Sequence, residues 1–317
     1  MLPVLLIVAR SLQIGSSILF AGIFTFEVIA LGPHGPQAVN DRNEFDRRLF
    51  RLALGALVVA QLSAFLWFCL VVLNMSGSGE GWRTVLFKTD FGRVWQLRLG
   101  LIVTAFALAG LGLTEKKWLS SVKVILFPLA LGLLVSLAWI SHAAAAGRQL
   151  LGLFGDTLHL CAAGAWMGGL LPLASFLTRA ETSVSLGEMA PGVLRRFSTL
   201  SLGCVSVLVL SGLSNSWLLV GSIGALFTTP YGLLLLFKLI IFGVLFGFGA
   251  RNRLIIKAAR WPAARYSDLF SQLRRNVICE ICLGLAVVAI VGWLGITPPA
   301  RHTNATEKEA AGTFRQA

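Results

Sequence analysis

Long apolar runs dominate the pattern of hydrophobic and polar positions along this chain of 317 residues. Each run approaches or exceeds the roughly 20 residues that an α-helix needs to cross the hydrocarbon core of a bilayer. Charged residues gather between the runs, and tryptophans are frequent at the run ends, as at a membrane interface. The pattern predicts eight membrane-spanning helices, near Pro3–Leu31, Arg48–Leu73, Phe91–Leu113, Trp118–Ile140, Gly152–Leu177, Phe197–Val220, Pro230–Ala250 and Val277–Ile296.

The composition agrees with this pattern, because 56% of the residues are hydrophobic and only 13% are charged. A soluble domain carries about a quarter charged residues. We therefore expect an all-α, polytopic membrane helical bundle, with residues 1–302 as a single domain and 303–317 as a polar, disordered tail. The first run has no small-residue cleavage site and contains Arg10, Gln13 and Glu27, so it is interpreted as a membrane helix and not as a signal peptide.

Basic residues are distributed unequally between the two sets of segments that connect the runs. Seventeen Lys and Arg residues fall on one side and seven on the other, with three more inside the spans. Connecting segments rich in Lys and Arg face the cytoplasm. The asymmetry therefore predicts that both termini lie outside the cell membrane. It also accounts for the formal net charge of +13 without a nucleic-acid partner.

Several polar side chains fall in the outer half of the predicted spans. Asp156 and His159 are one helical turn apart in an otherwise apolar segment, where both are costly unless something pairs with them. The other members of this layer are Arg10, Gln13, Arg98, Asn215 and Lys238. One interpretation is a polar site that opens outward; the other is that Arg98 or Lys238 pairs with Asp156 and only holds helices together.

An imidazole beside a carboxylate can bind a metal ion, with the carboxylate either as a second ligand or as the group that orients the imidazole. Asp156, His159, Ala163 and Trp166 share one helix face, and Met167 lies next to it. A single histidine inside the membrane can equally be a hydrogen-bonding partner for another helix. His142 and His302 are predicted in polar segments on the same outer side.

A second candidate metal site lies in the last span, where Cys279 and Cys282 flank Glu280. Thiolates suit a soft ion such as Cu(I). Cysteines are also common as small apolar side chains in a packed interior, so packing accounts for them equally well.

Eight short blocks of sequence carry a family resemblance. They are TDFGRVWQLRLGL (89–101), SHAAAAG (141–147), DTLHLCAAGAWMGGLLPL (156–173), RRFSTLSL (195–202), SGLSNSWLLVGS (211–222), TPYGLLLLFKL (229–239), RRNVICEICLG (274–284) and LGITPPARH (294–302). In this order they resemble the CopD (PcoD) family of bacterial inner-membrane copper resistance proteins. The resemblance is clearest over residues 89–302.

The resemblance implies a non-enzymatic protein of copper homeostasis in the bacterial inner membrane, with copper as the bound ion. By it, His142, Asp156 and His159 match histidine and acid positions of the family. Met167, Cys279, Glu280, Cys282 and His302 are candidates for a secondary site or a path across the membrane. No Met-rich or His-rich periplasmic segment is present in the sequence, so a periplasmic copper carrier of the CopC type is the expected partner.

The main alternative is a b-type cytochrome that transfers electrons. Haem iron in such a protein needs histidine pairs at matched depths on facing helices, and only His159 lies clearly within a span. A third interpretation is an assembly or sensor protein in which the polar layer is structural. The copper interpretation is favoured.

Overall fold

The computed structural model describes residues 1–32, 39–76, 81–114, 119–140, 149–259 and 267–300, and its regular elements within these ranges are all helical. A π-helical segment, Phe26–Leu31, continues the first helix, and a short 3-10 turn, Ala138–Ile140, follows the fifth. The α-helices are α1 (Leu2–Thr25), α2 (Val39–Ser76), α3 (Trp82–Lys88), α4 (Asp90–Thr114), α5 (Leu119–Val135), α6 (Gln149–Ala180), α7 (Val184–Val220), α8 (Ile223–Thr228), α9 (Pro230–Ala258) and α10 (Ser267–Leu294).

Eight of the described helical segments are long and apolar enough to cross a membrane, which confirms the predicted all-helical fold with eight candidate spans. The main difference lies in α7, which begins at Val184, whereas the sequence predicted a span from Phe197. The side chain of Ser183 caps this helix by accepting a hydrogen bond from the backbone N–H of Leu186 (3.2 Å). Such a cap satisfies one of the free N–H groups at a helix start. Residues 184–196, which lie between two predicted spans, form an amphipathic first stretch of α7.

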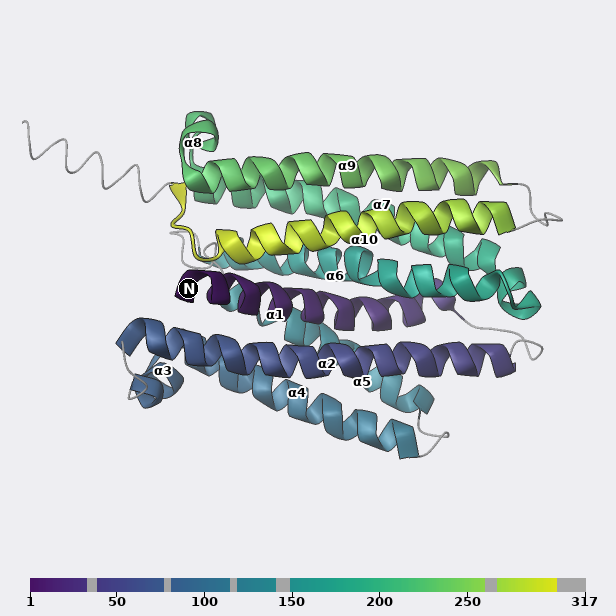
Figure 1. Ribbon diagram of the computed structural model, residues 1–317, viewed down its shortest axis with the longest axis horizontal. Helices are drawn as coiled ribbons and strands as arrows, with labels where there is room; N and C mark the ends of the chain where they lie inside the picture. Colours follow the sequence, from purple (N-terminus) through teal and green to yellow (C-terminus); the bar gives the residue numbers. More distant parts are fainter. Residues whose placement is uncertain (33–38, 77–80, 115–118, 141–148, 260–266, 301–317) are drawn as a thin grey trace, which may run out of the picture.

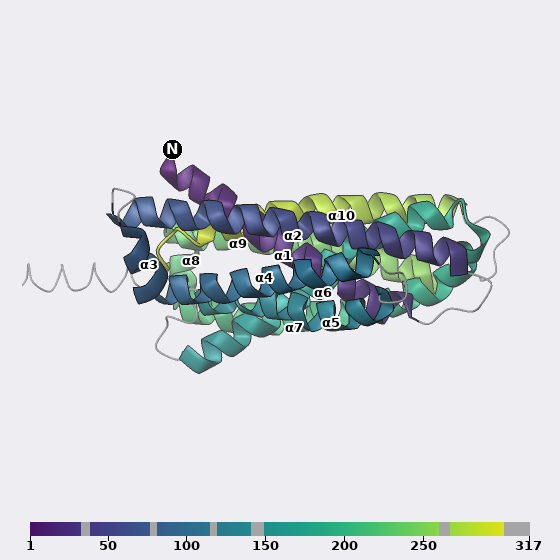
Figure 2. The same ribbon diagram turned by 90° about the horizontal axis from the view of Figure 1, so that it is seen from below.

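Helix α1 lies in the middle of the bundle and contacts α2 and α5 on one side and α6 and α10 on the other (Figure 1). Figure 2 gives the view turned by 90°, with α2 and α10 towards one face and α5 and α7 towards the other. Helices α1 and α6 approach each other closely where Gly22 faces Gly168. A Cβ atom at Gly22 would overlap the backbone of Gly168, so this crossing requires glycine. Small residues at such crossings let two helix backbones approach closely.

The two ends of the bundle differ in character. The N-terminus, α3, α8 and the end of α10 lie at one end, which we call the N-terminal end (Figure 1). The opposite end, which we call the basic end, carries the C-terminal ends of α6 and α9 and the beginnings of α7 and α10. The arrangement therefore separates the same two sets of connecting segments that the basic-residue count separates. The cytoplasmic assignment of the basic end stays a prediction.

Ion pairs tie the helices together near the basic end. Lys123 of α5 lies 3.1 Å from Glu27, in the π-helical continuation of α1, and 3.0 Å from Asp46 of α2. Asp46 also pairs with Arg42 one turn earlier, at 2.7 Å. Arg274 of α10 pairs with Glu181, beyond the end of α6, at 2.9 Å. Glu27 and Arg274 are thus engaged in structural contacts at this end.

Candidate functional site

His159 of α6 faces α7, where its Nδ1 atom lies 3.0 Å from the hydroxyl oxygen of Ser211. That hydroxyl also lies 2.6 Å from the backbone carbonyl of Val207, one turn earlier on α7. A serine hydroxyl carries a single hydrogen, and the carbonyl can only accept it. The hydroxyl oxygen then accepts a hydrogen bond from Nδ1–H of His159.

This arrangement assigns the tautomer of the neutral imidazole, because the second ring nitrogen, Nε2, then carries no hydrogen. A histidine with one nitrogen held by a hydrogen bond and the other bearing a free lone pair is the form that ligates metal ions in proteins. Helix α7 therefore orients the imidazole and leaves the lone pair of Nε2 available to coordinate a metal ion.

Asp156 contacts α7 one turn further towards the N-terminal end. The side-chain amide of Asn215 donates a hydrogen bond to its Oδ1 atom (2.5 Å). Ser211 and Asn215 are four residues apart, as are neighbouring positions on one face of a helix. Gly155 leaves the space for this contact, since a Cβ atom there would lie 2.8 Å from Oδ1 of Asn215.

A third helix contributes to the same cluster. Lys238 of α9 lies close enough to interact electrostatically with both Asp156 and His159, and Tyr231 of α9 interacts with Asp156. The interpretation in which Lys238 pairs with Asp156 therefore has a structural basis. The cluster joins a carboxylate, an imidazole, an amide and an ammonium group from α6, α7 and α9.

The remaining members of the predicted layer form a separate group on α1, α2, α4 and α5. Arg98 of α4 is 2% exposed and donates to the carbonyl of Leu133 (2.5 Å) and the hydroxyls of Ser136 (2.6 Å) and Ser17 (3.0 Å). The structure thus shows Arg98 bonded to neutral groups of α5 and α1, and Lys238 as the cation beside Asp156.

Arg10 and Gln13 of α1 belong to the same second group and contact α2. The guanidinium of Arg10 lies over the ring of Trp67, 4.8 Å from its centre. The side-chain carbonyl of Gln13 accepts a hydrogen bond from Ser63 (2.7 Å). The predicted single layer is therefore two groups, and only the one around His159 combines groups that can ligate a metal ion.

The candidate residues of the last span do not come together. Glu280 is 2% exposed and faces the bundle interior, whereas the Cys282 side chain is exposed and Cys279 is half-buried. Met167 of α6 packs against Gly284, where a Cβ atom would lie 3.0 Å from its methyl carbon. Within the described ranges, no three His, Cys, Asp or Glu side chains gather as they would around a metal ion. His142 and His302 lie outside the described residues.

Two protein-family models match the chain. The model for the copper resistance protein D-like N-terminal domain matches residues 1–152, and the model for copper resistance protein D matches residues 191–294. The chain belongs to the copper resistance protein D family. Together with the eight candidate spans, this membership identifies a multi-pass membrane protein.

Two curated bacterial relatives agree with this assignment. Copper transport protein CutJ of Bacillus subtilis (strain 168) is 30% identical over 253 residues, which are 76% of this chain and 44% of that protein. The chain thus spans less than half the length of this relative. Copper resistance protein D of Pseudomonas syringae pv. tomato is 27% identical over 266 residues, 79% of this chain and 84% of that protein. No solved structure matches the chain.

For this member of the copper resistance protein D family, the geometry adds residues that the sequence analysis did not select. Ser211 and Tyr231 belong to the cluster, and Asp156 and His159 lie between the two matched regions. The spacing of Ser211 and Asn215 was visible in the sequence. Nothing in the sequence showed that this face of α7 meets His159.

Proposed function

We propose that this protein binds copper at His159, in the half of the bundle nearer the N-terminal end, and passes the ion across the membrane. The observation that supports this proposal is the orientation of the imidazole, whose Nδ1 is held by Ser211 so that Nε2 is free. Neutral imidazole is a good ligand for copper. Asp156 lies one turn away as a second ligand or as a charge that favours a bound cation.

The wider setting of the proposal comes from the family. The names of the two relatives refer to copper transport and to copper resistance. We infer a non-enzymatic role in copper homeostasis, in a bacterial inner membrane, with copper delivered by a periplasmic carrier of the CopC type. His142 is the sequence-based candidate for a further ligand at the outer site.

Metal analysis of the purified protein, together with its absorption spectrum, tests the proposal. We expect bound copper and no haem Soret band. A Soret band without copper would instead identify the cytochrome alternative.

The support for the imidazole can be tested by the Ser211→Ala variant. Loss of the hydrogen-bond partner that orients a ligating histidine weakens metal binding by about 10–100-fold, so we expect a decrease in copper affinity of this size. Ser216→Ala is the matched control, because Ser216 donates only to the carbonyl of Gly212 (2.7 Å) on the same helix. Equal copper affinities of the two variants, measured by competition with a chelator, would contradict the proposed role of His159.

The proposed orientation can be tested by labelling single cysteines with a membrane-impermeant thiol reagent. Seventeen basic residues on one side against seven on the other place the basic end in the cytoplasm. We expect a cysteine at Arg83→Cys, on α3, to be labelled from outside intact cells, and one at Arg275→Cys, on α10, only after the cells are opened. Both positions are exposed. The reverse pattern would overturn the orientation and the outward-facing site with it.

A further inference from the structure

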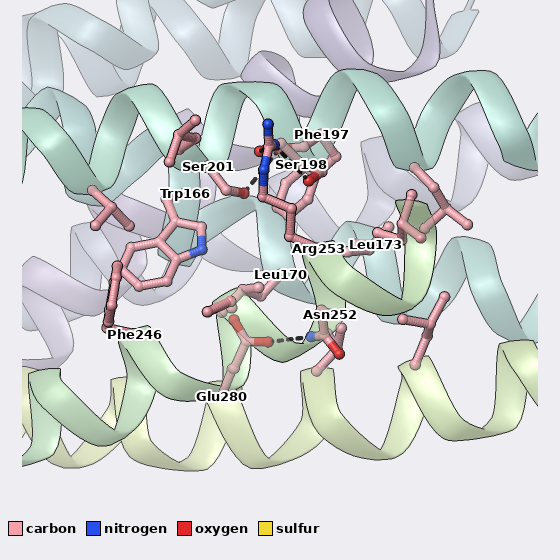
Figure 3. A pocket seen from close by; sticks show the side chains of 18 of the residues that line it. Trp166, Leu170, Leu173, Phe197, Ser198, Ser201, Phe246, Asn252, Arg253 and Glu280 are labelled. Atoms are coloured by element: carbon pink, nitrogen blue, oxygen red, sulfur yellow. Dashed lines mark hydrogen bonds between the residues drawn. The ribbon is translucent and has the colours of Figure 1, made fainter. Parts of the chain in front are cut away.

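A cavity lies between α6, α7, α9 and α10 in the half of the bundle nearer the basic end (Figure 3). Its volume is about 140 Å³, and apolar side chains, among them Trp166, Phe197 and Phe246, form most of its wall. Among the described residues that line it, only Glu280 and Arg253 can ionise. The cavity therefore combines a mainly apolar wall with one acid and one base.

Glu280 is buried against this cavity and has a neutral hydrogen-bond partner. Its Oε1 atom accepts from the side-chain amide of Asn252 (2.6 Å), and the carbonyl oxygen of that amide accepts from Asn276 (2.8 Å). Asn276 thereby fixes Asn252 as the donor to Glu280. One neutral donor does not replace the water that a carboxylate loses on burial, so the ionised form is costly here.

No neighbouring charge compensates for Glu280 among the described residues. Arg253 of α9 points to α7, where it donates to the carbonyl (3.2 Å) and hydroxyl (3.1 Å) of Ser198 (Figure 3). Arg274 of α10 is paired with Glu181, and Glu27 of α1 with Lys123. Helices α6 and α7 contribute no ionisable side chain to the described cavity wall. A positive charge that balances ionised Glu280 would therefore have to come from a cation that enters the cavity.

We propose that Glu280 is a proton-binding site, which holds a proton when the cavity is dry and releases it when water or a cation enters. Since Oε1 accepts from Asn252, the proton resides on Oε2. Release leaves a carboxylate and transfers the proton to water in the cavity. The copper site proposed above does not include Glu280. The neighbouring thiols, Cys279 and Cys282, lie on a different side of α10 from Glu280.

The cavity lies along the same face of α6 as the proposed copper site. Trp166 lies on the same face of α6 as Asp156 and His159, and it forms part of the cavity wall. At about 1.5 Å per residue, the seven positions from His159 to Trp166 correspond to roughly 10 Å along the helix. We infer that copper passing along this face releases the proton of Glu280. This coupling rests on the proposed copper function, whereas proton binding by itself does not.

Infrared spectroscopy of the full-length protein in lipid vesicles, without copper, tests proton binding. A protonated carboxyl group has a carbonyl stretching band that the carboxylate lacks. We expect the difference spectrum between the wild type and Glu280→Gln to contain this band at low pH and to lose it as the pH is raised. Glutamine can still accept the hydrogen bond of Asn252, so the variant should fold. Glu181→Gln is the matched control, and its spectrum should retain the band.

Two results would overturn the assignment. One is a wild-type spectrum that matches that of Glu280→Gln at every pH. The other is a Glu280 band that persists unchanged from acidic to strongly alkaline pH, because the group would then exchange no proton.

Coupling is tested by adding copper to vesicles that contain a pH-sensitive dye. We expect copper entry into wild-type vesicles to be accompanied by proton movement. Glu280→Gln should bind copper as the wild type does but move no protons. Proton movement equal to that of the wild type would overturn the coupling. Failure of the wild type to bind copper would instead contradict the proposed function and leave the infrared result intact.

Discussion

Replacing Gly168 with leucine is expected to prevent α1 and α6 from packing, so that the protein no longer accumulates in the membrane in folded form. A Cβ atom at this position would meet the backbone carbonyl of Ile18 and the Cα atom of Gly22. Backbone atoms cannot rotate away as a side chain can, and forced overpacking costs about 1–3 kcal/mol even where side chains can adjust. Both helices must shift, so we expect a loss at or above about 3 kcal/mol in the free energy of unfolding.

The measurement is the thermal unfolding of the purified variant in detergent, followed by tryptophan fluorescence, together with its abundance in membranes. Gly243→Leu on α9 is the matched control, because no atom beyond the adjacent backbone of α9 lies within 4 Å of a Cβ atom placed at Gly243. The control should unfold at the wild-type temperature. Equal stability of Gly168→Leu and Gly243→Leu would show that the α1–α6 crossing is looser than the structure indicates.

Replacing His159 with alanine is expected to abolish copper binding while the protein still accumulates in the membrane. Loss of an orienting partner alone weakens metal sites by about 10–100-fold, so loss of the ligand itself should exceed about 100-fold. The fold should tolerate the change because Ser211 keeps its hydrogen bond to Val207. Copper content after purification is the measurement, and Leu158→Ala, at an exposed neighbouring position, is the control.

The Asp156 variants separate the two roles of the carboxylate in this experiment. Asp156→Asn retains an oxygen that can accept the hydrogen bond of Asn215 and should bind copper better than Asp156→Ala. Wild-type copper content in both variants would reduce Asp156 to a packing partner of α7 and α9. Wild-type copper content in His159→Ala would contradict the proposed copper site.

The fold followed from the sequence because the length and apolar character of a span are properties of the segment itself. The beginning of α7 was the exception. There, Leu186, Ala190 and Val193 are buried, while Glu188, Arg195 and Arg196 are exposed on the same helix. The polar residues concealed the helical periodicity, and a capping serine at position 183 was the signal that the sequence analysis did not use.

The site was predictable only in part, because contacts between helices depend on their rotation and register. Asp156 and His159 are on one helix, so their shared face followed from their spacing. The contact of His159 with Ser211 and the division of the polar layer into two groups required the helices to be placed relative to one another. The Gly22–Gly168 crossing was equally hidden, since the chain contains 33 glycines and most of them carry no local mark of a close approach.

The central position of α1 has a consequence for biosynthesis. Chains are built and fold from the N-terminus, so α1 is inserted long before its partners α6 and α10 leave the ribosome. Until then the glycine face at Gly22 can contact only lipid or insertion machinery. A fragment ending at residue 152, where the match to the N-terminal family model ends, would lack the backbone of Gly168 that this face fits. The N-terminal family region is therefore expected to assemble correctly only when α6 is present in the same membrane.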